Sequence, residues 1–255
     1  MNTKFISFLT LFKREFNRFF KVPNNTILPH LITTLFYFLI FGIAIGSRIK
    51  EVAGVDYLLF ILPGLFVQNL INGSYSNPSG SLYVSRNFGN MSDILIAPIS
   101  NLSLTLAYVI AGMLRGIVLA LGTVLIALFF TTFSIENYPL LLIYIFLISF
   151  AFACMGVIIG LWAKTFDQLN IFINFVVTPL TFLGGVFYTT DIVPNFLATI
   201  TKFNPIFYMI NGTRYAMIGV KDGNVYIGLI FLIIITIILF YTTFTLIKKG
   251  YNLRT

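Results

Sequence analysis

Residues 225–247 read VYIGLIFLIIITIILFYTTFTLI, a run without a charged side chain, and Lys248 and Lys249 follow it directly. About 20 consecutive apolar residues are enough for an α-helix to cross the hydrocarbon core of a bilayer. The run is continuous rather than alternating, which favours a helix over a strand of a membrane barrel. It therefore predicts a transmembrane helix that ends at two lysines.

The composition of the whole chain agrees with this prediction. Of the 255 residues, 58% are apolar and only 9% are charged, and the mean hydropathy is +0.95. A soluble domain carries about a quarter charged residues because it must present a wetted surface. Backbone groups in hydrocarbon must pair within the protein, so spans are helices or closed barrels. We therefore expect an all-α integral membrane protein.

Five more apolar segments precede this run, which gives six expected spans. Pro63 and Pro78 fall inside the second segment, so we expect kinks or a broken inner end there. A polar stretch from Ser81 to Ser100 separates the second span from the third, and a semi-polar region, 189–223, precedes the last. The first five expected spans cover about 27–46, 57–80, 102–131, 140–162 and 170–188.

The N-terminal segment has the pattern of an amphipathic helix that lies in the membrane interface. Aromatic and apolar residues recur at steps of three and four, and polar or basic residues fill the other face. A solvated first helix of a soluble region is the alternative, which the aromatic content disfavours. No small-residue cleavage site follows, so we expect no cleavable signal peptide. The apolar face holds Phe5, Phe8, Leu9, Phe12, Phe16, Phe19 and Phe20, and the polar face holds Lys13, Arg14, Asn17, Arg18 and Lys21.

Orientation follows from Lys and Arg, which are enriched in the cytoplasmic loops of membrane proteins. With both termini inside, ten cations lie in cytoplasmic segments, five lie in outer loops and Arg115 lies within a span. An even number of spans also places both ends on one side, so we expect both termini in the cytoplasm. The inner set is Lys4, Lys13, Arg14, Arg18, Lys21, Arg86, Lys164, Lys248, Lys249 and Arg254, and the outer set is Arg48, Lys50, Lys202, Arg214 and Lys221.

Several classes of function are disfavoured by the polar residues. All eight acidic residues fall in loops or near span ends, and the single histidine, His30, lies at the start of the first span. Ion-coupled carriers usually need carboxylates or histidines at membrane depth. The lone Cys154 offers neither a disulfide nor a metal cluster. The net charge of +8 gathers at span ends, as topology requires, so we expect membrane lipids rather than nucleic acid as partners.

Arg115 is the one cation predicted inside a span. Counted from the inner end of the third span, it lies on the order of 20 Å deep, at 1.5 Å per residue. A cation there needs a polar cavity or partners. It could contact an anionic substrate or tie helices together through backbone carbonyls. It could instead snorkel towards the interface. Gly112 and Gly116 flank it and indicate a close-packed face.

The loop from Asn87 to Ser100 contains a short amphipathic segment, NMSDILIAPIS, over residues 90–100. Such a segment, stopped by Pro98, predicts a short helix that could dock in a groove of a soluble partner. An ordinary connecting loop is the alternative.

At this point the chain resembles the ABC-2 type permeases of ABC transporters, above all the small six-span bacterial subunits related to nodulation-factor and daunorubicin exporters. The resemblance covers essentially the whole chain. It is carried by FG…GSR over 41–48, FILPGL over 60–65, DILIAPI over 93–99, TPLTFLGGVFY over 178–188 and NPIFYMING over 204–212. Position 93 holds Asp, where relatives often carry Glu.

The resemblance implies a role for each of these features. Residues 1–24 would form a cytoplasmic amphipathic connecting helix, and 25–255 a six-span transmembrane domain. A coupling helix at about 88–98 would contact the ATPase through Asp93, Leu95, Ala97 and Pro98. The region of about 189–223, with Asn204, Pro205 and Tyr208, would form outer re-entrant helices. Arg115 would lie in the substrate pathway.

The resemblance also implies partners and a location. Two copies of this chain would work with two copies of a separate ATPase in a bacterial plasma membrane, and export would be its direction. The sequence has no G-x-x-x-x-G-K-[ST] phosphate loop, so ATP and Mg²⁺ would be bound by the partner and no cofactor by this chain. A lipid-modifying membrane enzyme and an ion-coupled carrier are the alternative functions. The substrate, whether drug, lipid, glycolipid or polysaccharide, stays open.

Overall fold

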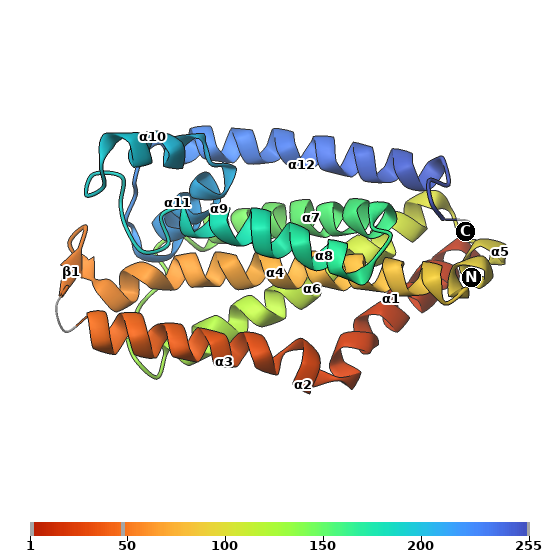
Figure 1. Cartoon of the computed structure of the whole chain (residues 1–255), viewed down its shortest axis with the longest axis horizontal. Helices are drawn as coiled ribbons and strands as arrows, with labels where there is room; N and C mark the ends of the chain where they lie inside the picture. Colours follow the sequence, from red (N-terminus) through yellow and green to blue (C-terminus); the bar gives the residue numbers. More distant parts are fainter. Residues whose placement is uncertain (1–2, 47–48, 254–255) are drawn as a thin grey trace.

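The computed structural model describes residues 3–46 and 49–253 and shows an elongated bundle of helices (Figure 1). Arg48 and Arg254 of the charge count, and Ser47 and Arg48 of the first motif, lie outside the described residues. In chain order the elements are α1 (Thr3–Lys21), α2 (Pro23–Thr26), α3 (Leu28–Tyr37), the π-helix η1 (Phe38–Ile45), β1 (Glu51–Val52), β2 (Val55–Asp56), α4 (Tyr57–Asn87), α5 (Asn90–Ile96), α6 (Asn101–Ala127), α7 (Tyr138–Trp162), α8 (Phe166–Phe172), the π-helix η2 (Ile173–Val177), α9 (Thr178–Phe182), α10 (Asn195–Phe203), α11 (Pro205–Ile218) and α12 (Val225–Lys248).

The two ends of the bundle differ in what they hold. The start of α1, the whole of α5 and the end of α12 lie at one end, which we call the α5 end (Figure 1). The β1–β2 hairpin and α10 lie at the other end, which we call the β1 end. The hairpin turns at Ala53 and Gly54, both at positive φ, and Asp56 then caps α4 by accepting from Leu58 N at 2.8 Å. The described chain thus begins and finishes on the same side, as an even number of spans requires.

By length and composition, four of the described helices could cross a membrane: α4, α6, α7 and α12. Their bounds lie close to the predicted second, third, fourth and sixth spans. The predicted first span corresponds to α3 and η1 together, and the predicted fifth to α8, η2 and α9. Both of these segments combine α-helix with π-helix, and the count of six spans stays a prediction.

The prediction that the second span ends at residue 80 and a polar connection begins at Ser81 is wrong, because α4 continues through Pro78 to Asn87 without a break. Serine side chains satisfy backbone groups inside this helix: Ser79 Oγ donates to the carbonyl of Tyr75 at 2.9 Å. Arg86 reaches across to the last turn of α7 and donates to the carbonyls of Gly160 and Leu161 at 2.9 and 2.8 Å. Ser81, Ser85 and Arg86 of this stretch are therefore buried, whereas Asn87 at the end of α4 is exposed.

The centre of the bundle is α4, which packs along α6 and α7. It is the least apolar of the four long helices, yet most of its residues are buried. Its neighbours approach through glycines: a Cβ on Gly116 would meet the carbonyl oxygen of Leu70 at 2.5 Å, and one on Gly160 would meet that of Ser79 at 2.9 Å. Gly112, also predicted on a close-packed face, lies against the carbonyl of Ser74. Backbone-to-backbone contact therefore sets the spacing of these three helices.

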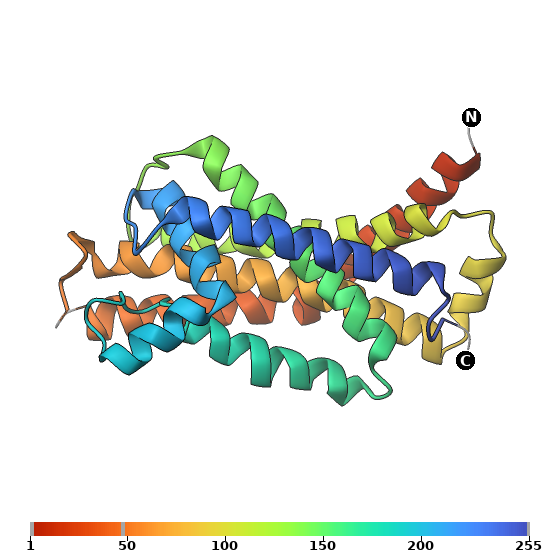
Figure 2. The same cartoon turned by 90° about the horizontal axis from the view of Figure 1, so that it is seen from above.

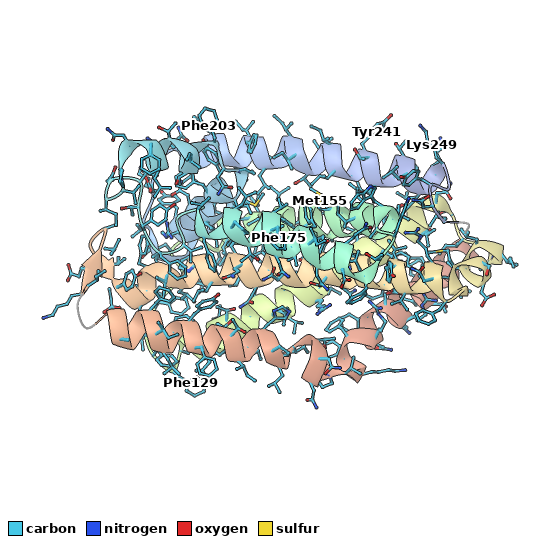
Figure 3. All side chains as sticks on the ribbon, viewed as in Figure 1. Phe129, Met155, Phe175, Phe203, Tyr241 and Lys249 are labelled. Atoms are coloured by element: carbon cyan, nitrogen blue, oxygen red, sulfur yellow. The ribbon has the colours of Figure 1, made fainter. Side chains whose placement is uncertain are left out.

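The last helix, α12, lies at the edge of the bundle. Its apolar residues point in all directions, and few are buried. Figure 3 shows Tyr241 and Lys249 on the outer side of this helix, and Tyr241 is 71% exposed. A helix that is apolar all round and exposed on one side fits contact with lipid chains.

We predict that Gly116→Val destabilises the protein by about 1–3 kcal/mol, the usual range for overpacking, because the added Cβ meets the backbone of α4. The measurement is the thermal unfolding midpoint of the purified chain in detergent. Gly80→Ala is the matched control, since a Cβ at Gly80 meets no atom within 4 Å. Equal midpoints for Gly116→Val and Gly80→Ala would contradict the role given to glycine packing.

Candidate functional site

The predicted short helix is present as α5, and it lies at the α5 end between α4 and α6 (Figure 1). Gly89 begins it in the left-handed conformation at φ 77°, and the backbone becomes extended at Ala97. Met91 and Ile94, three residues apart, are buried in the apolar cluster that also holds Leu11 of α1 and Leu104 of α6. The helix is therefore fixed to the bundle along one face only.

The other face of α5 is exposed. Asp93, Ala97 and Pro98 are on the surface, whereas Leu95 is half-buried against the cluster that holds Met91. Two large apolar side chains that the motif reading did not single out also stand here: Phe88 is 75% exposed and Ile96 is 83% exposed. Apolar side chains this exposed beside a carboxylate form a surface suited to a protein partner.

The N-terminal helix is anchored more deeply than an amphipathic pattern predicts. Leu11, Glu15 and Phe19, spaced by four, form a buried stripe against the bundle, with Glu15 only 1% exposed. The Glu15 carboxylate accepts from Arg14 at 2.8 Å and from the hydroxyl of Ser81 on α4. Figure 2 shows the start of α1 projecting away from the other helices, while its second half lies against them. Glu15 therefore lies outside the predicted spans, as expected of the acidic residues, although nothing in the sequence indicated its burial.

Arg115 is buried in the bundle. It is 8% exposed, and its Nη2 donates to the carbonyl of Thr26, at the end of α2, at 3.2 Å. The structure therefore provides the predicted tie between helices through a backbone carbonyl. Its Nε has no hydrogen-bond partner. No carboxylate pairs with Arg115 in the part of the chain that the structure describes.

The predicted outer region, 189–223, contains two short helices, α10 and α11, that meet at Asn204. Asn204 donates to the carbonyl of Leu180 at 2.5 Å and accepts from Ile206 N at 2.9 Å, so it caps α11 and ties it to α9. Pro205 occupies the first helical position, where a missing N–H costs nothing. The Tyr208 hydroxyl donates to the carbonyl of Lys202 at 2.9 Å. Tyr208 thus links α11 to α10, and Asn204 links α11 to α9.

Arg214, expected in an outer loop, lies instead in a helix of the predicted outer region. It lies within α11 and is fully buried, with its guanidinium 3.9 Å from the ring centre of Phe60 on α4. Its Nη2 donates to the carbonyls of Gly185 and Val186 at 2.6 and 3.4 Å. The signal in the sequence was the helix start at Asn204-Pro205, which carries Arg214 into a helix.

The comparisons with known proteins define the class to which this architecture belongs. Residues 6–218 match the family model for the ABC-2 type transporter, so the chain belongs to that family and is a transport permease rather than an enzyme. The resemblance drawn from the sequence motifs is thereby confirmed.

Two groups of relatives cover nearly the full length of the chain. It is 33% identical over 254 residues to the inner membrane transport permease YadH of Escherichia coli (strain K12). The aligned residues cover 100% of this chain and 99% of that protein. It is 24% identical to nodulation protein J of Rhizobium leguminosarum bv. trifolii, with 96% and 94% covered. Nodulation protein J of Rhizobium meliloti (strain 1021) is 21% identical, with 88% and 85% covered.

We predict that Arg214→Leu lowers the unfolding midpoint in detergent, because the carbonyls of Gly185 and Val186 lose their buried donor. Leaving a buried acceptor unpaired costs about 1–3 kcal/mol. The control is Lys202→Gln, which removes an exposed cation from the same end of the bundle. A midpoint for Arg214→Leu that matches the control would show that this arginine does not stabilise the β1 end.

Proposed function

We propose that this chain is the membrane subunit of an ATP-driven exporter and that two copies form the substrate pathway and work with two copies of a separate ATPase. In this proposal α3–η1 and α8–η2–α9 complete a set of six spans, and α10 and α11 are short outer helices that cap the pathway. Residues 1–24 are the cytoplasmic connecting helix and 25–255 the transmembrane domain. The α5 end faces the cytoplasm of a bacterium, with both termini there, and the protein resides in the plasma membrane.

The observation that carries the proposal is the two-faced attachment of α5. Its inner residues, Met91 and Ile94, belong to a buried apolar cluster shared with α1, α4 and α6, while Asp93 and Ile96 stand exposed. A rigid partner that contacts the exposed face and moves would displace α5, and α5 would displace the helices that it touches. The Ser7 hydroxyl of α1 also donates to the carbonyl of Pro98 at 3.3 Å, a second link between α1 and this loop.

The energy for transport would come from the partner. The sequence contains no phosphate-binding loop, so ATP and Mg²⁺ belong to the ATPase chains in this proposal. A partner can shift the permease between two arrangements only if it binds them with different free energies. The exposed side of α5, with Asp93, Ala97 and Pro98, is where we expect those contacts to differ, and Leu95 would support them from its half-buried position.

We predict that Asp93→Arg abolishes co-purification of the ATPase with this chain. Reversing a charge in an interface places like charges together, which costs several kcal/mol, so the recovered ATPase should fall by about tenfold or more. The measurement is a pull-down of the detergent-solubilised chain from its native membranes, with stoichiometry by mass spectrometry. Unfolding is checked by size-exclusion chromatography.

Asp191→Arg is the matched control, because Asp191 is an exposed acid in the region at the β1 end. It should leave the amount of ATPase unchanged. Recovery of the wild-type chain without a nucleotide-binding partner, under conditions that preserve other ABC complexes, would overturn the proposal. Equal loss of ATPase with both variants would remove α5 as the coupling surface.

We predict that cysteines introduced singly at the α5 end and on α10 are accessible to labelling from opposite sides of the membrane. The natural Cys154 is buried and is replaced by alanine as background. Lys249→Cys, at the α5 end, should react with a membrane-impermeant maleimide only in inverted vesicles, and Thr199→Cys of α10 should react in intact cells. Both positions are exposed. The reverse pattern would invert the proposed orientation, and labelling of both from one side would contradict the six-span arrangement.

A further inference from the structure

Beside the junction of α1 and α2 lies a cavity of about 230 Å³ that none of the roles above uses. It is lined from four directions: α1 and α2, the last third of α4, α6, and the start of α8. The residues that matter for its chemistry are Arg18, Ser76, Asn77, Gly80, Arg115 and Phe166.

The lining carries two positive charges and no carboxylate. Arg18 and Arg115 come from different helices, and their charges repel each other. Glu15, the nearest acid on α1, is held by Arg14 at 2.8 Å, lies 3.8 Å from Arg18 Nε, and does not line the cavity. Two guanidinium groups held near each other in a partly dehydrated place favour an anion between them.

Buried donors in the lining lack partners. Arg115 Nε has none, and neither has Asn77 Nδ2, although Asn77 is only 1% exposed. One nitrogen of each arginine is already engaged: Arg18 Nη2 donates to the carbonyl of Asn77 at 2.9 Å, and Arg115 Nη2 to that of Thr26 at 3.2 Å. A buried donor without an acceptor is costly. Arg115 and Asn77 both line the cavity, so they are the side chains that an acceptor placed there would draw on.

The rim of the cavity is apolar. Val22 and Phe166, which also line it, are 48% and 54% exposed, and Phe20 on the adjoining turn of α1 is 45% exposed. A ligand with a small anionic head and apolar chains matches both parts, because the head meets the arginines while the chains lie along the exposed side chains. A free anion would use only the first part.

We propose that this cavity binds the phosphate headgroup of an anionic lipid. Arg18 and Arg115 would contact the phosphate oxygens, with Asn77 Nδ2 as a third donor, and the acyl chains would leave past Val22 and Phe166. This binding rests on the geometry of the chain itself and does not depend on the ATPase proposed above.

The test titrates the purified full-length chain, in an uncharged detergent and without an ATPase, with phosphatidylglycerol, phosphatidylcholine or inorganic phosphate. Native mass spectrometry measures the bound lipid, and the unfolding midpoint gives a second readout. We expect phosphatidylglycerol to bind and raise the midpoint, and Arg115→Gln to weaken its binding by about tenfold, as loss of a charged hydrogen-bond donor does.

Two further variants separate binding from folding and from surface charge. A Cβ at Gly80 meets no atom within 4 Å, so Gly80→Leu should fold normally, fill the cavity and block the lipid, while Gly80→Ala should not. Lys249→Gln removes an exposed cation at the same end and should bind phosphatidylglycerol as the wild type does.

Three outcomes would overturn the proposal. The first is unchanged phosphatidylglycerol binding in both Arg115→Gln and Gly80→Leu. The second is equal weakening by Lys249→Gln, which would indicate attraction to the whole basic surface. The third is inorganic phosphate that binds the cavity as well as the lipid does, which would make the ligand a free anion.

Discussion

The close approach of α6 and α7 to α4 is the contact on which the rest of this molecule depends. Glycines on α6 and α7 lie against backbone atoms of α4. Serine hydroxyls on α4 donate to carbonyls within their own helix. Dispersion contacts and hydrogen bonds hold such helices together in a bilayer, where lipid chains are as apolar as the side chains themselves. With the three helices spaced in this way, polar side chains can be buried between them without contact with hydrocarbon.

Three arginines connect further elements to these helices by donating hydrogen bonds to backbone carbonyls. Arg86 holds the last carbonyls of α7, Arg115 holds the end of α2, and Arg214 holds the segment before α10. None of the three is paired with a carboxylate among the described residues. Each positive charge instead receives carbonyl dipoles at a place where a helix stops or bends. The same residue type thus fixes α7, the N-terminal helices and the β1 end onto a common centre.

Much of the fold could be predicted from the sequence, and the failures have physical causes. The long helices α6, α7 and α12 were expected within a few residues, because continuous apolar runs have one explanation in a chain with so few charges. The end of α4 was missed because Ser81 and its neighbours look like a loop when hydrogen-bond partners on other helices are unknown. Arg214 was placed in a loop for the same reason. The residues alone indicated a short helix over 90–100 with a connecting loop as the alternative, and the family resemblance assigned the contact residues, of which Ala97 and Pro98 lie beyond the end of α5. The exposed Phe88 and Ile96 could be recognised only after Met91 and Ile94 were seen to face inward.

The contrast between α12 and α4 has a consequence for how this protein can change over evolution. Few positions on α12 are buried, and the exposed ones require only an apolar side chain, so we expect exchanges among Ile, Leu, Phe and Val to be tolerated there. Positions on α4 are constrained by backbone contact, hydrogen bonding and volume at once, and few residues satisfy all three. We therefore expect the sequence of α12, the helix that most clearly indicates a membrane protein, to vary freely among apolar residues. We expect the sequence of α4, the least hydrophobic of the four long helices, to be the most constrained.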